Sequence, residues 1–125
     1  MKLRIRGDSV RLRLTRSEVA RLADGATVEE ATHFPGGTVL RYALLSRAGA
    51  ASVGAGFAAG LLTVEVPEHA ARHWATTETV EIRAEVPFDG GVLTVLVEKD
   101  FPCLTTRPGE DDSDAFQPGE TRTRC

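Results

Sequence analysis

The sequence predicts a small, mainly β domain of the α+β class, in which a β-β-α-β-β unit occurs twice and forms one barrel-like or sandwich core with two short helices. Three observations support this prediction. Apolar and charged residues alternate over several short segments, as they do in strands with one buried face. Glycine-rich turns, Pro35-Gly36-Gly37 and Asp89-Gly90-Gly91, stand at matching places in the two halves of the chain. The apolar pattern of residues 12–29 also recurs 52 residues later without a gap.

The first unit begins with a hairpin and a short helix. Residues 2–6 and 10–14 alternate between apolar and basic side chains, and Gly7-Asp8 separates them. Glycine and aspartate tolerate the positive φ that short hairpin turns need, so two paired strands are expected here. Thr15 and Glu18 then have the spacing of a capping box, which predicts a short helix directly after the hairpin.

Two further strands, at 27–34 and 38–45, complete the first unit on either side of its glycine turn. The second unit repeats this order, and its Trp74 aligns with Leu22 on the core face of the helix. Its elements are expected as strands at 55–59 and 61–66, a helix with Pro67 at its first position, and strands at 79–88 and 92–97.

The two units, over 2–46 and 53–99, are expected to share one core in a single domain over 1–104. Residues 105–125 are rich in Pro, Gly, Thr and acids, which predicts an acidic, polar and flexible tail. No run is apolar for long enough to span a bilayer and the opening residues have no signal-peptide pattern, so a cytoplasmic protein with no membrane partner is expected. The formal net charge of -3 neither favours nor excludes nucleic acid as a partner.

The first copy resembles the swapped-hairpin domains of the AbrB and MazE kind over residues 2–30. The resemblance lies in the Gly7-Asp8-Ser9 turn, the strand Val10-Arg11-Leu12-Arg13-Leu14, the short helix and the strand start Thr27-Val28, and it returns weakly over 55–82. It implies a barrel that two chains form together in that family, with basic hairpins that bind DNA; here both halves would lie in one chain. This chain departs from the family pattern in its added hairpin strands, in Thr15 at a position that is usually proline, and in a second copy without a basic hairpin face.

The whole chain is also similar to a family of short, uncharacterised bacterial proteins. The shared features are the opening Met1-Lys2-Leu3-Arg4-Ile5-Arg6, the segment Glu98-Lys99-Asp100-Phe101-Pro102-Cys103-Leu104 and the acids that follow it. This resemblance covers nearly the full length and implies no particular function.

Basic side chains alternate along the first hairpin and are the main candidate binding site. Strand periodicity puts five of them on one side of the hairpin: Lys2, Arg4, Arg6, Arg11 and Arg13. These cations repel one another unless water or anions surround them, and phosphates are a suitable match that would bind without reading sequence. Two other interpretations stay open: a solvated outer sheet face, and a face that meets the chain's own acidic tail.

Two groups of residues suggest metal ligands. His69 and His73 lie four residues apart and share one face of the second predicted helix, as zinc ligands often do, with Cys103 or His33 as a candidate third ligand. Both histidines are expected to be exposed, because their face lies opposite Trp74. The tail acids Glu110-Asp111-Asp112-Ser113-Asp114 are candidate oxygen ligands for Mg²⁺ or Ca²⁺. Apart from zinc at the first group, no cofactor is indicated.

These observations favour a non-catalytic binding or regulatory domain whose basic hairpin face engages an anionic partner, with nucleic acid as the main candidate. One alternative is a small metal-binding protein or enzyme that uses His69, His73 and Cys103. Another is a protein–protein assembly module, a homo-oligomer whose exposed sheet edges pair with another copy. The sequence contains no Walker loop, Cys-x-x-Cys motif or nucleophile elbow, so an enzyme is the less favoured reading.

Overall fold

The computed structural model describes residues 1–101 and contains a β-β-α-β-β order twice. The prediction of a mainly β domain with two short helices is confirmed. The elements are β1 (Lys2–Ile5), β2 (Ser9–Leu14), α1 (Arg16–Ala23), β3 (Val28–His33), β4 (Val39–Arg47), β5 (Gly54–Ala58), β6 (Leu61–Pro67), α2 (Glu68–Thr76), β7 (Glu81–Phe88) and β8 (Gly91–Lys99). The predicted domain end at residue 104, the tail and Cys103 lie outside the described residues.

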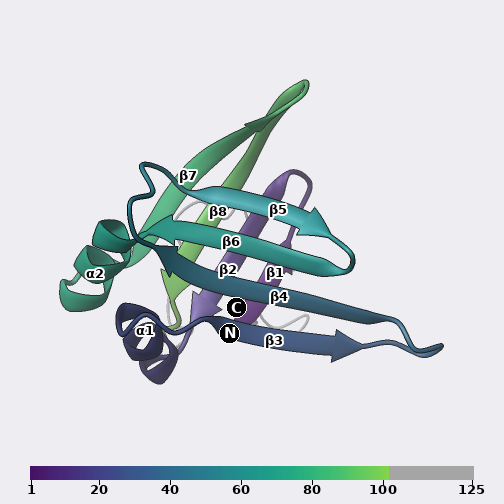
Figure 1. Cartoon of the computed structure of the whole chain (residues 1–125), viewed down its shortest axis with the longest axis horizontal. Helices are drawn as coiled ribbons and strands as arrows, with labels where there is room; N and C mark the ends of the chain where they lie inside the picture. Colours follow the sequence, from purple (N-terminus) through teal and green to yellow (C-terminus); the bar gives the residue numbers. More distant parts are fainter. Residues whose placement is uncertain (102–125) are drawn as a thin grey trace, which may run out of the picture.

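Each of the two four-stranded sheets combines a hairpin from one unit with a hairpin from the other. Sheet A has the strand order β1-β2-β8-β7, and sheet B has the order β3-β4-β6-β5 (Figure 1). The two central pairs, β2 with β8 and β4 with β6, are parallel, whereas the outer pairs are antiparallel. The first unit therefore gives its first hairpin to sheet A and its second hairpin to sheet B, and the second unit does the reverse.

The core lies between the sheets and is built from matching rows of aliphatic side chains. Across sheet A one row is Leu3, Leu12, Val97 and Ile82, and across sheet B the corresponding row is Ala55, Val64, Leu44 and Val28. All eight residues belong to the core cluster or pack against it. Leu22 of α1 and Trp74 of α2 are also buried in it, so the helices contribute the largest side chains at one end.

The gapless alignment of the two units is wrong after the second helix. Leu12 and Val64 occupy matching positions at an offset of 52, but the structural match of Val28 is Ile82, at an offset of 54. The segment from Trp74 to Ile82 is two residues longer than the matching segment from Leu22 to Val28, and it leaves Val80 46% exposed. The Val80 carbonyl oxygen instead accepts hydrogen bonds from Trp74 Nε1 at 2.9 Å and from the Lys99 amide at 3.0 Å. The insertion thus satisfies the polar group of a buried tryptophan.

The two helices lie together at one end of the sandwich, while the β3–β4 and β7–β8 hairpins extend away from the body (Figure 1). The predicted capping box of α1 is present: the Thr15 side chain accepts a bond from the Glu18 amide, and the Glu18 carboxylate accepts one from the Thr15 amide. Because α1 has only eight residues, this cap fixes its first turn directly after β2.

Candidate functional site

The basic side chains of the first hairpin project from the face of sheet A that points away from sheet B. Lys2 lies opposite Arg13 and Arg4 opposite Arg11, and residues paired in this way share one face. Because Leu12 and Leu14 belong to the core and Leu3 packs against it, the alternate residues point outward. We call this outer surface the basic face and define it by Lys2, Arg4, Arg6, Arg11, Arg13 and Arg83.

Arg83 of β7 is a member that sequence reasoning missed. It pairs with Leu96 of β8, which in turn pairs with Arg11, so both arginines belong to one row across the sheet. The signal was present in the alternation of residues 81–88. Placing Arg83 on this face also required the parallel pairing of β2 with β8, and no local pattern predicts that pairing.

The basic face has a buried centre and an exposed margin. Arg11 and Arg13 are only 7% and 6% exposed, and both contact Glu98, which is 5% exposed. The Nε atoms of Arg13 and Arg11 lie 3.1 Å and 3.6 Å from Glu98 Oε1. At the margin, Lys2 is 72% exposed in its side chain and pairs with Asp100 Oδ2 at 3.0 Å, and Arg4, Arg6 and Arg83 are also exposed. Burial of a shared carboxylate between two guanidinium groups holds the centre rigid, so the margin offers cations on a fixed frame.

The predicted histidine pair is on α2, and His69 and His73 are both exposed, as expected. His73 Nε2 lies 3.4 Å from the hydroxyl oxygen of Thr79. Within residues 1–101, no group of three His, Cys, Asp or Glu side chains is arranged to hold a metal ion. One candidate for the third ligand, Cys103, and the tail acids proposed for Mg²⁺ or Ca²⁺ lie outside the described residues.

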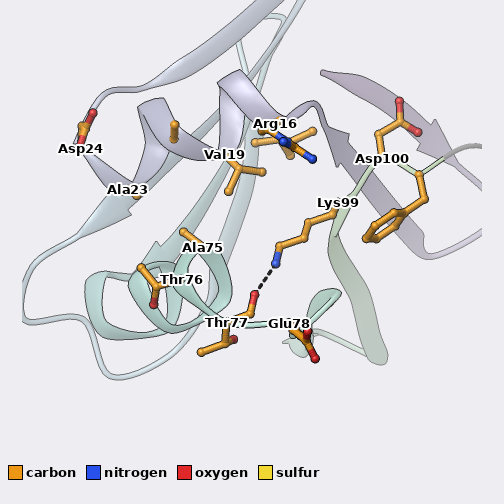
Figure 2. Close-up of a pocket in the computed structure, with 13 residues that line it drawn as sticks. Arg16, Val19, Ala23, Asp24, Ala75, Thr76, Thr77, Glu78, Lys99 and Asp100 are labelled. Carbon is orange, nitrogen blue, oxygen red and sulfur yellow. Dashed lines mark hydrogen bonds between the residues drawn. The ribbon is translucent and has the colours of Figure 1, made fainter.

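A cavity of about 820 Å³ lies between α1, α2 and the end of β8 (Figure 2). Its apolar wall includes Val19 and Ala23 of α1 and Ala75 of α2. Lys99 extends toward α2, where its Nζ donates a 2.8 Å hydrogen bond to the Thr77 carbonyl oxygen.

Charges of both signs surround this cavity. Arg16 and Lys99 are the cations of the lining, and Asp24, Glu78 and Asp100 are the carboxylates. The described lining contains no histidine, cysteine or serine. An apolar wall with separated charges is suited to binding a small amphipathic molecule.

A third charged cluster holds the first residue against the rest of the first unit. The Met1 ammonium group contacts Glu18 Oε2 at 2.5 Å and also contacts Glu30, and Tyr42 Oη donates to the Met1 carbonyl oxygen at 3.5 Å. Burial acts to lower the pKa of this ammonium group, but its hydrogen bonds to the two carboxylates outweigh burial and raise the pKa. Burial acts to raise the pKa of Glu18, and the bond from the ammonium group outweighs it, so the pKa of Glu18 is lowered. The cluster is structural, because it fastens the start of β1 to α1 and β3.

The geometry therefore offers two binding surfaces, the basic face and the cavity between the helices. Among residues 1–101, neither helix has the length and apolar character needed to cross a membrane. No curated protein and no solved structure matches the chain. A family model does match, over residues 1–119, and the chain therefore belongs to DUF7009, a family of unknown function.

Proposed function

We propose that this protein is a non-catalytic binding domain whose basic face engages a polyanionic partner, with nucleic acid as the main candidate. The observation that carries this proposal is the exposed set of cations at the margin of sheet A, where Lys2, Arg4, Arg6 and Arg83 stand around a rigid centre. Exposed guanidinium groups can contact backbone phosphates without reading base edges. The exchange of hairpins between the two units also supports the resemblance to swapped-hairpin domains, whose basic hairpins bind DNA.

The buried centre decides which residues test this proposal. Arg11 and Arg13 are unsuitable, because their replacement would leave the buried Glu98 carboxylate without its partners and would disturb the fold. Arg4, Arg6 and Arg83 are exposed, so their replacement by glutamine removes positive charge with little effect on packing. A matched control replaces Arg21, Arg41 and Arg72, three exposed arginines from other surfaces.

The test is a titration of labelled duplex DNA with the full chain and with both triple variants over a series of salt concentrations. Each phosphate contact contributes about -0.9 to the slope of log K against log salt, so four exposed cations predict a slope of about -3 to -4. The variant of the basic face should bind more weakly and with a slope of about -1, while the control keeps the affinity and slope of the unmodified chain. Absence of binding at low salt, or equal losses in both variants, would refute the proposal.

A second candidate function rests on the cavity between the helices, whose volume of about 820 Å³ is large enough for a small amphipathic molecule. The cations Arg16 and Lys99 favour a ligand that carries a carboxylate on an apolar body. Thermal shift measurements with octanoate and indole acetate would detect it. Ala23→Leu, which fills part of the cavity, should abolish the shift, and Ala58→Leu on an exposed part of β5 should not. The second candidate fails if neither probe raises the unfolding temperature.

A further inference from the structure

Strand β5 is the least protected edge of the two sheets. It closes sheet B and, among the described strands, pairs with β6 alone. Its sequence is Gly-Ala-Gly-Phe-Ala, and the whole stretch 48–64 contains no charged residue. The other three edge strands carry charges or proline, which discourage pairing with another chain: Lys2 and Arg4 in β1, Glu29 and Glu30 in β3, and Glu81, Arg83, Glu85 and Pro87 in β7.

The turn after β5 determines which backbone groups face the free edge. Ala59 and Gly60 have positive φ angles of 51° and 76°, so they form a two-residue type I′ turn between β5 and β6. Ala58, directly before the turn, therefore belongs to a hydrogen-bonded pair, and such pairs alternate along an antiparallel ladder with pairs that are not hydrogen-bonded. It follows that Ala55 and Phe57 point their N–H and C=O groups away from β6, where an added strand can pair with them.

Apolar side chains lie beside this edge. Phe57 is 67% exposed, whereas its partner Leu62 on β6 is 7% exposed, because no described strand lies on the open side of β5. The β7–β8 hairpin of sheet A extends past β5 (Figure 1), and its Phe88 is 48% exposed. Phe88 lies two residues after Val86, which packs against the core, so it belongs to the face of sheet A that points toward sheet B. An added strand would therefore place alternate side chains on the side where Phe57 and this hairpin lie.

The charges and the space around β5 indicate the kind of partner. A charged side chain placed against this uncharged edge would lose water without gaining an opposite charge, which is costly. A second copy of β5 is also uncharged, but antiparallel pairing of two β5 strands would put both copies of sheet A on one side of the joined sheet. The β7–β8 hairpin of each copy extends past β5 on that side and would run into the other copy. A single extended segment needs only the width of one strand, about 5 Å.

We propose that β5 is the docking site for an uncharged, extended peptide segment of another protein, which adds to sheet B as a fifth strand and places alternate apolar side chains over Phe57. The site lies on the other sheet from the basic face, so this inference does not rest on the function proposed above.

The test titrates the full chain with a synthetic peptide in which valine and threonine alternate over about seven residues between terminal lysines. Amide hydrogen exchange is followed by NMR. At saturating peptide the amide protons of Ala55 and Phe57 should exchange about tenfold more slowly, because they gain acceptors. The amide protons of Gly54 and Gly56 already face β6 and should exchange as before.

Two variants test the edge itself. Phe57→Lys places a charge on the edge and should weaken peptide binding about tenfold or more. The matched control is Phe34→Lys, which changes a phenylalanine that is 50% exposed beside β3 and should leave the affinity unchanged. Equal losses in both variants, or no slowing at Ala55 and Phe57 with millimolar peptide, would overturn the proposal. Slowing that appears without peptide as the protein concentration rises would identify a second copy as the occupant and would overturn it as well.

Discussion

Replacement of Glu98 by glutamine removes a carboxylate that contacts both buried guanidinium groups of β2, while it keeps the size of the side chain. The contacts at 3.1 Å and 3.6 Å lie in a site where the Glu98 side chain is 6% exposed, so water screens them weakly. Removal of one partner of a buried ion pair costs about 3–5 kcal/mol, because the remaining charge stays buried without compensation. We expect a loss at the lower end, about 3 kcal/mol, which corresponds to a fall of about 15 °C in the unfolding temperature of a domain of this size.

Urea denaturation followed by the fluorescence of Trp74, the single tryptophan, measures this loss, and far-UV circular dichroism checks that both probes report one transition. The control is Glu85→Gln, which changes an exposed glutamate on the same face of sheet A and should alter stability by less than about 0.5 kcal/mol. If Glu98→Gln costs no more than the control, the centre of the basic face is not held by these ion pairs and the argument for a rigid centre fails.

Two further predictions concern the backbone and the first residue. Gly60 has φ +76, and an added Cβ would lie 3.0 Å from a backbone oxygen of β4. Gly60→Ala should therefore lower the free energy of unfolding, measured by urea denaturation, by about 1–3 kcal/mol. The control Gly56→Ala, with open space around it, should change this free energy little. The pKa of the Met1 ammonium group is higher in the folded chain than its ordinary value, so the group stabilises the fold at pH values below that ordinary pKa. This stabilisation is lost as the pH rises through the pKa of the group in the folded chain. The pKa of Glu18 is lower in the folded chain than the ordinary glutamate pKa, so Glu18 stabilises the fold at pH values above that ordinary pKa. This stabilisation is lost as the pH falls through the pKa of Glu18 in the folded chain. The stability difference between the unmodified chain and Glu18→Gln, from urea curves across pH, should therefore be largest between about pH 5 and 8, and a difference that is constant with pH would contradict the assignment.

Local signals predicted the elements, because strand alternation, glycine turns and the capping box each depend on residues close together in the sequence. The error after α2 has a physical cause that is not local. The indole group of Trp74 needs an acceptor once it is buried. The segment from Trp74 to Ile82 is two residues longer than its match from Leu22 to Val28, and it supplies the Val80 carbonyl oxygen. An apolar pattern records which side chains are apolar, and it carries no information about the acceptor.

In the candidate site, too, the local features were predicted and the features that depend on distant residues were not. Alternation along β1 and β2 put the five cations of the hairpin on one face, and the pairing of Lys2 with Arg13 and of Arg4 with Arg11 agrees with that arrangement. Arg11 and Arg13 both contact Glu98, which is 85 residues from Arg13 in the sequence. The cavity likewise forms only where α1 packs against α2 beside the end of β8, and no sequence motif in either helix predicts this packing.

The exchange of hairpins makes the two sheets equivalent in architecture but unequal during synthesis. Sheet B is built from one continuous stretch, β3 to β6, so it is complete in sequence once residue 67 has been made. Sheet A joins the two ends of the described chain, and closing a loop of 85 residues costs about 1 kcal/mol more entropy than closing the 20-residue separation of Ser46 and Val66 in sheet B. During translation the edge of β2 that faces β8 therefore stays unpaired until β8 has emerged from the ribosome. In that interval β8 of another copy can pair with β2 in its place. A high rate of synthesis should therefore favour strand-exchanged dimers that form through sheet A rather than through sheet B.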